Sequence, residues 1–338
     1  MKIAFTGDLS FFNIDNYTDT PFNKIVPFIK KIKLVINLET IFLPSNCRKM
    51  AIKTKICLKQ ASYTLKYLQK LHPLLINLSN NHINDYGNFG AEYTKKLLSS
   101  KKIPSFGAGF LNQTHNIFVL KKQKIMFLAY TTQETDLSGS KLFNEVKFIG
   151  PKELSVSTFK NQTMKYIGYK KIVLIHWGLE QKKYPSPEQR KIARELINAG
   201  SDLIIGSHSH TIQGYELYCG KYIFYSLGNF LFPHVQFTIF RKKYSHYQAQ
   251  KNRESILPIF SIGLKKIKLD NIYLVKSNKK FELRLLKLSK EFFKEYNPFF
   301  NQSIEKYSFF YIAYSIKEKI VVICYFFPYL IYKHFIKK

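Results

Sequence analysis

Apolar runs of strand length alternate with amphipathic stretches along residues 1–225 of the chain. Runs this short, bounded by polar or glycine residues, predict buried strands. The predicted strands are Lys2–Phe5, Lys33–Leu38, Leu74–Leu78, Ile125–Tyr130, Lys171–Ile175, Asp202–Ile205 and Lys221–Tyr225. Apolar residues at helical spacing predict helices at Ser62–Leu68, Phe89–Leu98 and Glu188–Ala199. This alternation favours an α/β fold in which helices cover sheets.

The pattern changes in the last third of the chain. Arg241–Arg253 is polar and predicts an exposed loop. Ile256–Leu269 and Asn271–Leu285 alternate like two antiparallel strands, with a turn at Ser277–Lys280, and we expect them to close the sheet of the main domain. From about residue 289 the sequence is aromatic and Lys-rich. We therefore expect a domain over residues 1–288 and a C-terminal extension, largely helical, over residues 289–338.

Side chains of the types that bind metal ions follow the carboxyl ends of five predicted strands. They are Asp8, Glu39, Asn81, His82, His176, His208 and His210. His208 and His210 are two residues apart, so they point the same way from one loop. Ligands gather at the carboxyl ends of strands in α/β folds. Carboxylate, amide and imidazole together suit Mn, Fe, Zn or Mg, and two such ions about 3.5–4 Å apart would activate a water molecule.

Each of these residues also has an ordinary structural interpretation. Asp8 could cap a turn or a helix, Glu39 could be a surface charge, and Asn81 could be a turn residue. His176 could pack in the core against Trp177. It is their recurrence at successive strand ends that favours a metal site over a set of unrelated residues.

The chain is strongly basic, with a formal net charge of +31. Two interpretations stay open: drift of the composition toward AT-rich codons, or a partner that is polyanionic or an anionic membrane surface. Only six of the 53 basic residues are Arg. Because bidentate recognition of bases and phosphates relies on Arg, this argues against specific binding of nucleic acid while allowing nonspecific attraction.

The four cysteines are scattered and form no C-x-x-C pair, so neither a zinc knuckle nor a redox motif is indicated. No signal peptide precedes the first strand, and we expect a cytoplasmic protein. The longest apolar run, Ile320–Tyr332, has 13 residues and contains Pro328, which is too short to span a bilayer. The C-terminal extension could pack on the domain, or it could lie at a membrane surface with Lys333, Lys337 and Lys338 against anionic lipid.

Six motifs carry a resemblance to a known family. They are Gly7-Asp8, Asn37–Glu39, Asn80–His82 with Asp85–Gly87, His176–Gly178, Gly206–His210 and Tyr225–Phe230. In this order they resemble the CapA-type capsule synthesis family of bacteria, which is associated with poly-gamma-glutamate capsules. The resemblance covers about residues 1–285. It implies the calcineurin-like metallophosphoesterase fold, a two-sheet β-sandwich flanked by helices.

The resemblance also implies a role for each candidate. Asp8 and His210 would hold a first metal ion, Glu39 would bridge, and Asn81, His176 and His208 would hold a second. His82 would lie beside the metals and donate a proton to the leaving group. Asn37 and Asn80 would shape the loops, and Gln213 and Asn229 would orient ligands.

The sequence departs from metallophosphoesterases at large in two places. These begin with Asp-x-His, whereas Asp8 is followed by Leu9 and Ser10, and Glu39 stands where a bridging Asp is common. The capsule family shows similar changes, which argue against ordinary phosphoesterase turnover. Three functions stay open: a hydrolase acting on an anionic polymer or a phosphorylated precursor, a phosphodiesterase or nuclease of the same fold, and a non-catalytic subunit of a capsule synthesis complex.

Overall fold

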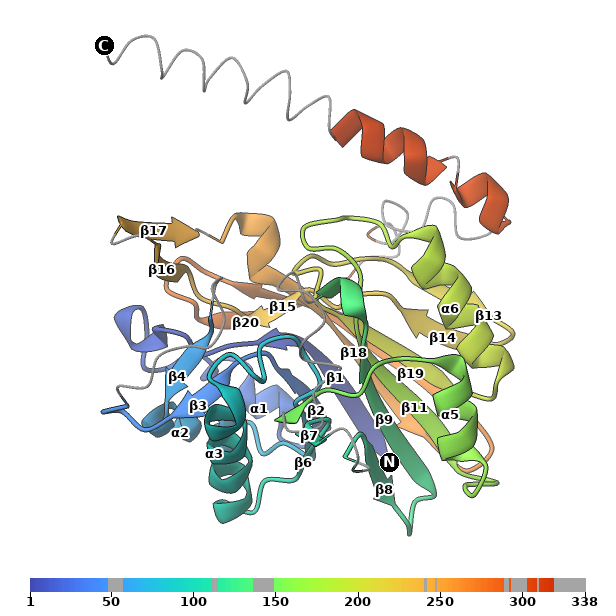
Figure 1. Cartoon of the computed structure of the whole chain (residues 1–338), viewed down its shortest axis with the longest axis horizontal. Coiled ribbons are helices and arrows are strands. Elements are labelled where there is room, and N and C mark those ends of the chain that lie inside the picture. Colours follow the sequence, from blue (N-terminus) through green and yellow to red (C-terminus); the bar gives the residue numbers. More distant parts are fainter. Residues whose placement is uncertain are drawn as a thin grey trace.

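The protein is a mixed α/β structure built around two main sheets, with helices on their outer faces (Figure 1). The computed structural model describes residues 1–47, 57–110, 113, 115–135, 149–239, 242–246, 248–288, 292, 303–308 and 310–318. The predicted alternation of strands and helices over residues 1–225 is confirmed.

The first sheet is centred on β1 (Lys2–Leu9). On one side of β1 the strands run parallel to it: β2 (Lys33–Leu38), β5 (Leu75–Asn77) and β6 (Ser105–Phe106). On the other side the sheet continues with antiparallel neighbours: β18 (Glu254–Ile262), β19 (Ile267–Ser277) and β20 (Leu283–Lys287). The short strand β15 (Asn229–Leu231) runs parallel to the carboxyl end of β1 and sets Asn229 opposite Asp8.

The second sheet has a parallel centre and antiparallel edges. Its strands, in spatial order, are β13 (Tyr215–Tyr218), β14 (Lys221–Phe224), β12 (Leu203–Ser207), β11 (Lys170–His176), β9 (Ile125–Thr131) and β8 (Ile117–Leu120). Three two-stranded ribbons complete the described strands: β3 (Ile41–Leu43) with β4 (Lys59–Ala61), β7 (Gly109–Phe110) with β10 (Ile149–Gly150), and β16 (Val235–Ile239) with β17 (Lys242–His246).

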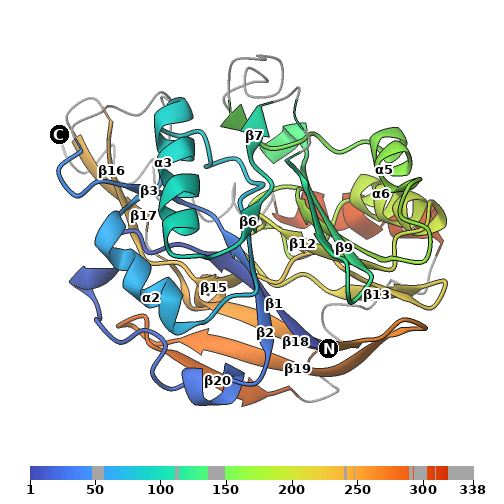
Figure 2. The ribbon, with the colours of Figure 1, turned by 90° about the horizontal axis from the view of Figure 1, so that it is seen from below.

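Strand alternation divides the core into layers. In β1, Ile3 and Phe5 point toward the second sheet, whereas Ala4 points to the opposite face. That opposite face is covered by α1 (Val26–Ile29), α2 (Leu65–Lys70) and α3 (Gly87–Ser100). The outer face of the second sheet is covered by α5 (Val156–Thr163) and α6 (Pro187–Asn198). Figure 2 shows α2 and α3 on one side of the strands and α5 and α6 on the other.

Four short 3₁₀ helices lie in the connections: η1 (Ile14–Asn16), η2 (Ser62–Thr64), η3 (Gln133–Thr135) and η4 (Gln250–Arg253). The best-defined helix start is that of α6. Ser186 accepts a hydrogen bond from the Gln189 N–H, and the Gln189 side chain accepts one from the Ser186 N–H. This capping box, followed by Pro187, fixes where the helix begins.

Two expectations for the last third of the chain are wrong. Arg241–Arg253 is not simply a loop, because it contains β17 and η4. Ile256–Leu285 forms three strands rather than two, with an additional turn at 263–266 besides the one at 278–282. Gly263 interrupts an alternating run there, and pattern alone does not separate the strands that flank it. As expected, these strands extend the sheet that contains β1.

Part of the C-terminal extension packs on the main domain. The helical residues 304–308 and 310–318 lie beside α6 and the loop before it, and Tyr307 is buried. The Tyr307 hydroxyl donates to the Pro185 carbonyl at 2.7 Å, and the Arg190 guanidinium lies 4.3 Å from the ring centroid. Lys182 and Glu318 form an ion pair at 2.5 Å.

The rest of the extension bears on two earlier expectations. Ile320–Tyr332 and the lysines at 333, 337 and 338 lie outside the described residues, so contact of the tail with a membrane stays a prediction. Within the described ranges, no helix combines the length and the hydropathy that a bilayer crossing requires. The domain boundary at residue 288 also stays a prediction.

Candidate metal centre

The carboxyl ends of strands from both sheets meet at one place. Asp8 is the next-to-last residue of β1, Glu39 directly follows β2, His176 ends β11, and His208 directly follows β12. All four side chains are buried, although each is charged or titratable. Buried groups of this kind are costly unless they are paired or bind a cation.

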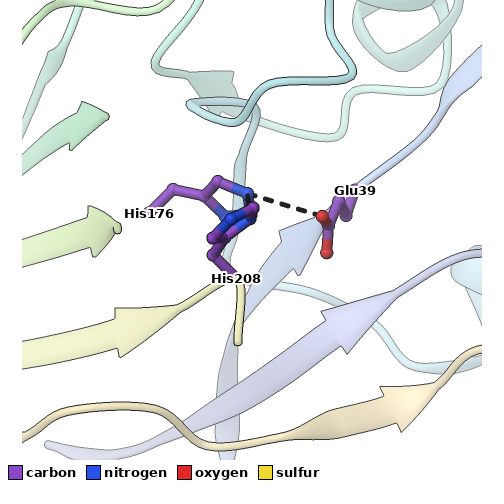
Figure 3. A group of neighbouring side chains, drawn as sticks. All are labelled: Glu39, His176 and His208. Atoms are coloured by element: carbon purple, nitrogen blue, oxygen red, sulfur yellow. Dashed lines mark hydrogen bonds and ion pairs between the residues drawn. The ribbon is translucent and has the colours of Figure 1, made fainter. Parts of the chain in front are cut away.

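Glu39, His176 and His208 form the first cluster (Figure 3). The Nε2 atom of His176 lies 3.4 Å from Oε1 of Glu39 and 3.0 Å from Nδ1 of His208. The other ring nitrogen of His176 lies 3.0 Å from the Ser207 hydroxyl. This contact fixes the orientation of the imidazole, so that Nε2 is directed at Glu39.

Asp8, Glu39 and His210 form the second cluster. Nδ1 of His210 lies 3.6 Å from Oδ2 of Asp8, and Nε2 of the same ring lies 3.6 Å from Oε1 of Glu39. Within each cluster the candidate ligand atoms all lie within 4.8 Å of one another. Glu39 belongs to both clusters, and two buried triads that could hold metal ions therefore share one carboxylate.

The electrostatics of the two carboxylates favour a cation between them. Burial raises the pKa of Glu39 well above its usual value, and the nearby Asp8 raises it further. Burial also raises the pKa of Asp8, against the opposing effect of His210 and the hydrogen bond from Asn37. Neither oxygen of Glu39 receives a hydrogen bond from any of the residues that the structure describes. A divalent cation would supply the missing counter-charge.

His208 lies in an environment that keeps it neutral. Burial lowers the pKa of His208 well below its usual value, with further lowering by His210 and His82. A neutral imidazole is the form that binds metal ions. His208 and His210 both have positive φ angles, 95° and 55°, which turn the loop sharply after β12. This turn brings the side chains of His208 and His210 back over the carboxyl ends of the strands.

Asn81 and His82 lie at the edge of the clusters. Asn81 Oδ1 is 3.0 Å from Nε2 of His176, and its Nδ2 donates to the Thr135 carbonyl at 3.2 Å. His82 Nδ1 lies 2.7 Å from Oδ2 of Asp85. Asp85 is fully buried, and its position three residues after His82 places both in one turn. Asp85 holds the His82 ring in place, and this contact was not predicted from the sequence.

Three asparagines support the candidate ligands. Asn37 donates to Oδ1 of Asp8 at 2.6 Å, and Asn80 donates to the Leu38 carbonyl and accepts from the His82 N–H. Asn229 Oδ1 lies 2.9 Å from Nδ1 of His210. That Asn37 and Asn80 shape the loops and that Asn229 orients a ligand stay predictions.

Gln213 forms a hydrogen bond outside the two clusters, and its expected role of orienting a ligand stays a prediction. Within the described part of the chain it contacts no candidate ligand, and its Nε2 donates instead to the Lys182 carbonyl at 3.0 Å. The Thr211 hydroxyl donates to the same carbonyl at 2.9 Å, and the Gln181 N–H donates to the Ser209 carbonyl at 2.8 Å. Gln213 thus fastens the loop before α6 to the loop that carries His208 and His210.

Two glycines allow the strand ends to approach this closely. A Cβ atom on Gly7 would lie 1.9 Å from the Gly228 carbonyl oxygen. A Cβ atom on Gly206 would lie 2.0 Å from the Tyr225 carbonyl oxygen. Because both neighbours are backbone atoms, any larger residue would push the strands apart and displace the residues that follow, Asp8 and Ser207.

Known proteins resemble the chain over most of its length. A family model described as the bacterial capsule synthesis protein PGA_cap matches residues 2–234. The capsule biosynthesis protein CapA of Bacillus anthracis is 27% identical over 256 residues, which are 73% of this chain and 62% of that protein. The PGA biosynthesis protein CapA of Bacillus subtilis is 31% identical over 181 residues, 53% of this chain and 47% of the relative.

Two more distant likenesses complete the comparison. A probable polyglutamine synthesis accessory protein of Mycobacterium tuberculosis is 26% identical over 207 residues, covering 58% of this chain and 54% of the relative. The chain therefore matches less than two thirds of the length of each of these three relatives. A hypothetical protein of Thermus thermophilus aligns structurally over 86% of this chain and all of its own, with 9% identity and a TM-score of 0.47.

The family model covers well over half of the chain, and it includes every candidate ligand and each of the asparagines that support them. The resemblance inferred from the six sequence motifs is thus confirmed: the chain belongs to the PGA_cap family of bacterial capsule synthesis proteins.

Proposed function

We propose that the chain is a metal-dependent, hydrolase-like protein that acts in the synthesis or processing of a capsule polymer of the poly-gamma-glutamate type. The observation that carries this proposal is Glu39: a fully buried carboxylate, without a hydrogen bond from the described residues, that belongs to both candidate triads. A carboxylate in such a position is suited to bridging two divalent ions.

The ligands divide into two sets. Asp8 and His210 would hold the first ion, Asn81, His176 and His208 would hold the second, and Glu39 would be shared. Mixed oxygen and imidazole ligands fit Mn, Fe, Zn or Mg. Two such ions would supply an activated water and would polarise the oxygen of the bond to be broken. This arrangement, with two sheets and outer helices, is the one expected of the calcineurin-like metallophosphoesterase fold.

His82 is placed to donate a proton to the leaving group. Its Nδ1 faces Asp85, and its side chain is 11% exposed, so the ring reaches the edge of the buried centre. Asp85 holds the ring through Nδ1, so Nε2 is the ring nitrogen left to pass a proton to the leaving group. The His82 ring is thus a proton donor with a fixed orientation.

The substrate is proposed from the relatives and from charge. Two of the relatives are named for capsule or PGA biosynthesis, and one is named a probable accessory protein of polyglutamine synthesis. A net charge of +31 would concentrate an anionic polymer or a phosphorylated precursor near the protein. We propose an amide or ester bond of an acidic polymer, or a phosphoester of its precursor, as the target.

The first experiment is metal analysis of the purified chain, together with hydrolysis of a bis-aryl phosphodiester with and without manganese. Two metal ions per chain, with turnover lost in His82→Ala while the metals stay bound, would support the proposal. Metals without turnover would direct the assay to polyglutamate itself. Failure to bind any metal after manganese loading would overturn the proposal. Cleavage of DNA or RNA instead would point to a nuclease.

A second candidate function is a non-catalytic subunit of a capsule synthesis complex. It is favoured by Ser10, which stands where metallophosphoesterases carry a metal-binding histidine. The Ser10 hydroxyl accepts a hydrogen bond from the Phe12 N–H at 3.2 Å. It is therefore engaged in its own loop. Retained capsule synthesis in cells carrying Glu39→Ala and His208→Ala would establish this function.

A further inference from the structure

One cavity of the protein is lined mainly by basic residues, as an anion-binding site would be. It has a volume of about 330 Å³ and lies where η4, the turn between β19 and β20, and the segment before α1 meet. Five of its nine lining residues are basic: Lys24, Arg253, Lys276, Lys279 and Arg284. Lys and Arg make up only 53 of the 338 residues, so the basic composition of the chain does not account for this density. We call this cavity the basic pocket.

Three of these cations have no acidic partner. Lys276 pairs with Glu254 at 2.8 Å, and Lys24 lies 3.9 Å from Glu282. By contrast, Arg253, Lys279 and Arg284 form no ion pair with any carboxylate of the described residues. The Nε atom of Arg253 is buried and has no acceptor among these residues. The pocket thus carries an excess of positive charge and an unsatisfied donor.

The backbone that presents these cations is held in place. Phe281 is fully buried with a φ of 57°, and its ring lies 4.9 Å from that of Tyr17 and 5.0 Å from that of His234. Asn278 accepts hydrogen bonds from the N–H groups of residues 280 and 282, and the Ser277 hydroxyl donates to the Arg253 carbonyl. Because the turn is already ordered, binding an anion there costs little further conformational entropy.

The basic pocket is joined to the metal centre by a short series of contacts. Asn229, which contacts His210, also donates to the Asn252 carbonyl at 2.8 Å. Asn252 directly precedes Arg253 in η4. This helix therefore contacts the residue that orients a candidate metal ligand, and its last residue lines the basic pocket.

We propose that the basic pocket is a binding site for the carboxylates of an acidic polymer. Guanidinium groups bind carboxylates in a bidentate manner, and the pocket holds two of the six arginines of the chain. Repeated carboxylates along one polymer match three unpaired cations in one cavity. The choice of polyglutamate as the polymer rests on the proposed function, whereas the existence of the site does not.

The test is binding of a short, fluorescently labelled poly-gamma-glutamate to the full chain, followed by anisotropy. The triple variant Arg253→Gln, Lys279→Gln, Arg284→Gln removes the three unpaired charges. The control variant Lys121→Gln, Lys122→Gln, Lys124→Gln removes the same charge from an exposed turn directly before β9. This turn lies at the opposite strand ends from His176, because β9 runs parallel to β11.

We expect the pocket variant to weaken binding by at least about tenfold and the control by less than about twofold. Equal weakening by both variants would show diffuse attraction and overturn the proposal. Tighter binding of polyphosphate or single-stranded DNA, with the same dependence on Arg253 and Arg284, would overturn the assignment to carboxylates.

A measurement in chelator separates this site from the metal centre. The metal-free chain should bind the labelled polymer as the manganese-loaded chain does, whether or not the chain proves to be a hydrolase. Loss of binding in chelator would place the polymer at the metal centre instead and overturn the proposal. Failure of the hydrolase assay alone leaves the anisotropy result unchanged, so the two failures are distinguishable.

Discussion

Glu39 and His176 meet across the two main sheets, with Oε1 of the first 3.4 Å from Nε2 of the second. Glu39 follows β2 in one sheet and His176 ends β11 in the other. Any cation bound between them therefore cross-links the two sheets. The stability of the fold and the occupancy of the metal centre are consequently linked.

Glu39→Gln should change stability in opposite directions with and without metal. In the metal-free chain the ionised form of Glu39 is disfavoured by burial and by Asp8, so replacing it with a neutral amide should raise the free energy of unfolding at neutral pH by about 1 kcal/mol or more. Manganese at about 100 times its Kd should stabilise the unmodified chain by about 2.7 kcal/mol, and the variant by much less. Thermal unfolding with chelator and with manganese measures both effects. Equal stabilisation of both proteins by manganese would exclude Glu39 as a ligand.

Asp85→Asn should lower turnover while leaving metal content unchanged. The substitution keeps the shape of the side chain but removes the carboxylate that lies 2.7 Å from His82 Nδ1. A proton donor of this kind contributes about 10²- to 10⁴-fold, so we expect a loss of at least about tenfold in kcat, smaller than that of His82→Ala. Turnover and metal content are measured on the same samples. Loss of metal in Asp85→Asn would show that the residue supports the ligands instead.

Asp202 should make stability depend on pH. Burial raises its pKa, but hydrogen bonds from the Lys221 ammonium and the Lys171 N–H, and the charge of Lys170, outweigh this and hold the pKa below its usual value. A lowered folded-state pKa contributes stability above the unfolded pKa of about 3.9, and the contribution is lost as pH falls through the folded value.

Asp202→Asn should therefore cost about 1 kcal/mol at neutral pH, and the difference should shrink as pH falls from about 4 toward about 2. Urea unfolding across this pH range measures the difference in the free energy of unfolding between the variant and the unmodified chain. The exposed Asp19→Asn serves as the control and should stay within about 0.5 kcal/mol. A cost for Asp202→Asn that does not vary with pH would show that the shape of the side chain, not its charge, stabilises this end of the second sheet.

Gly7→Ala should destabilise the fold by about 2 kcal/mol or more and weaken metal binding. The added Cβ would meet the Gly228 carbonyl, which accepts the hydrogen bond from the Asp8 N–H at 2.9 Å. Gly263→Ala is the matched control, because its Cβ would lie 3.6 Å from the nearest atom, an ordinary contact. Unfolding and metal affinity are compared for the two variants. Similar behaviour of both would mean that β1 and β15 can separate without cost.

The candidate ligands could be located from the sequence because their positions follow from simple rules. A polar residue at the end of each apolar run must lie at the carboxyl edge of a parallel sheet, and His208 and His210 share a direction through their spacing. The division into strands and helices followed from the same periodicity. Gly200, for example, follows the last turn of α6 and has a φ of 104°, as a helix stop requires.

What the sequence could not supply were contacts between side chains and the pairing of polar strands. Gln213 lies three residues past His210 in the segment between β12 and β13, and nothing in the sequence fixes which way its amide points. The contact between Asp85 and His82 lies within one turn, and a spacing of three residues permits this contact but does not require it. Arg241–Arg253 looks like a loop because the sequence of β17, Lys242–His246, has no apolar alternation, and nothing in it reveals the pairing with β16.

The docked helical residues 304–308 and 310–318 contact the loop before α6, and this loop also contacts the loop that carries His208 and His210. Tyr307 of these residues donates to the Pro185 carbonyl, and Glu318 pairs with the Lys182 side chain. The Lys182 carbonyl in turn accepts hydrogen bonds from Thr211 and Gln213. Coupling between two sites is reciprocal by thermodynamic necessity. Whatever factor a molecule that favours the docked helix applies to metal affinity at the candidate centre, metal loading must apply the same factor to the affinity for that molecule.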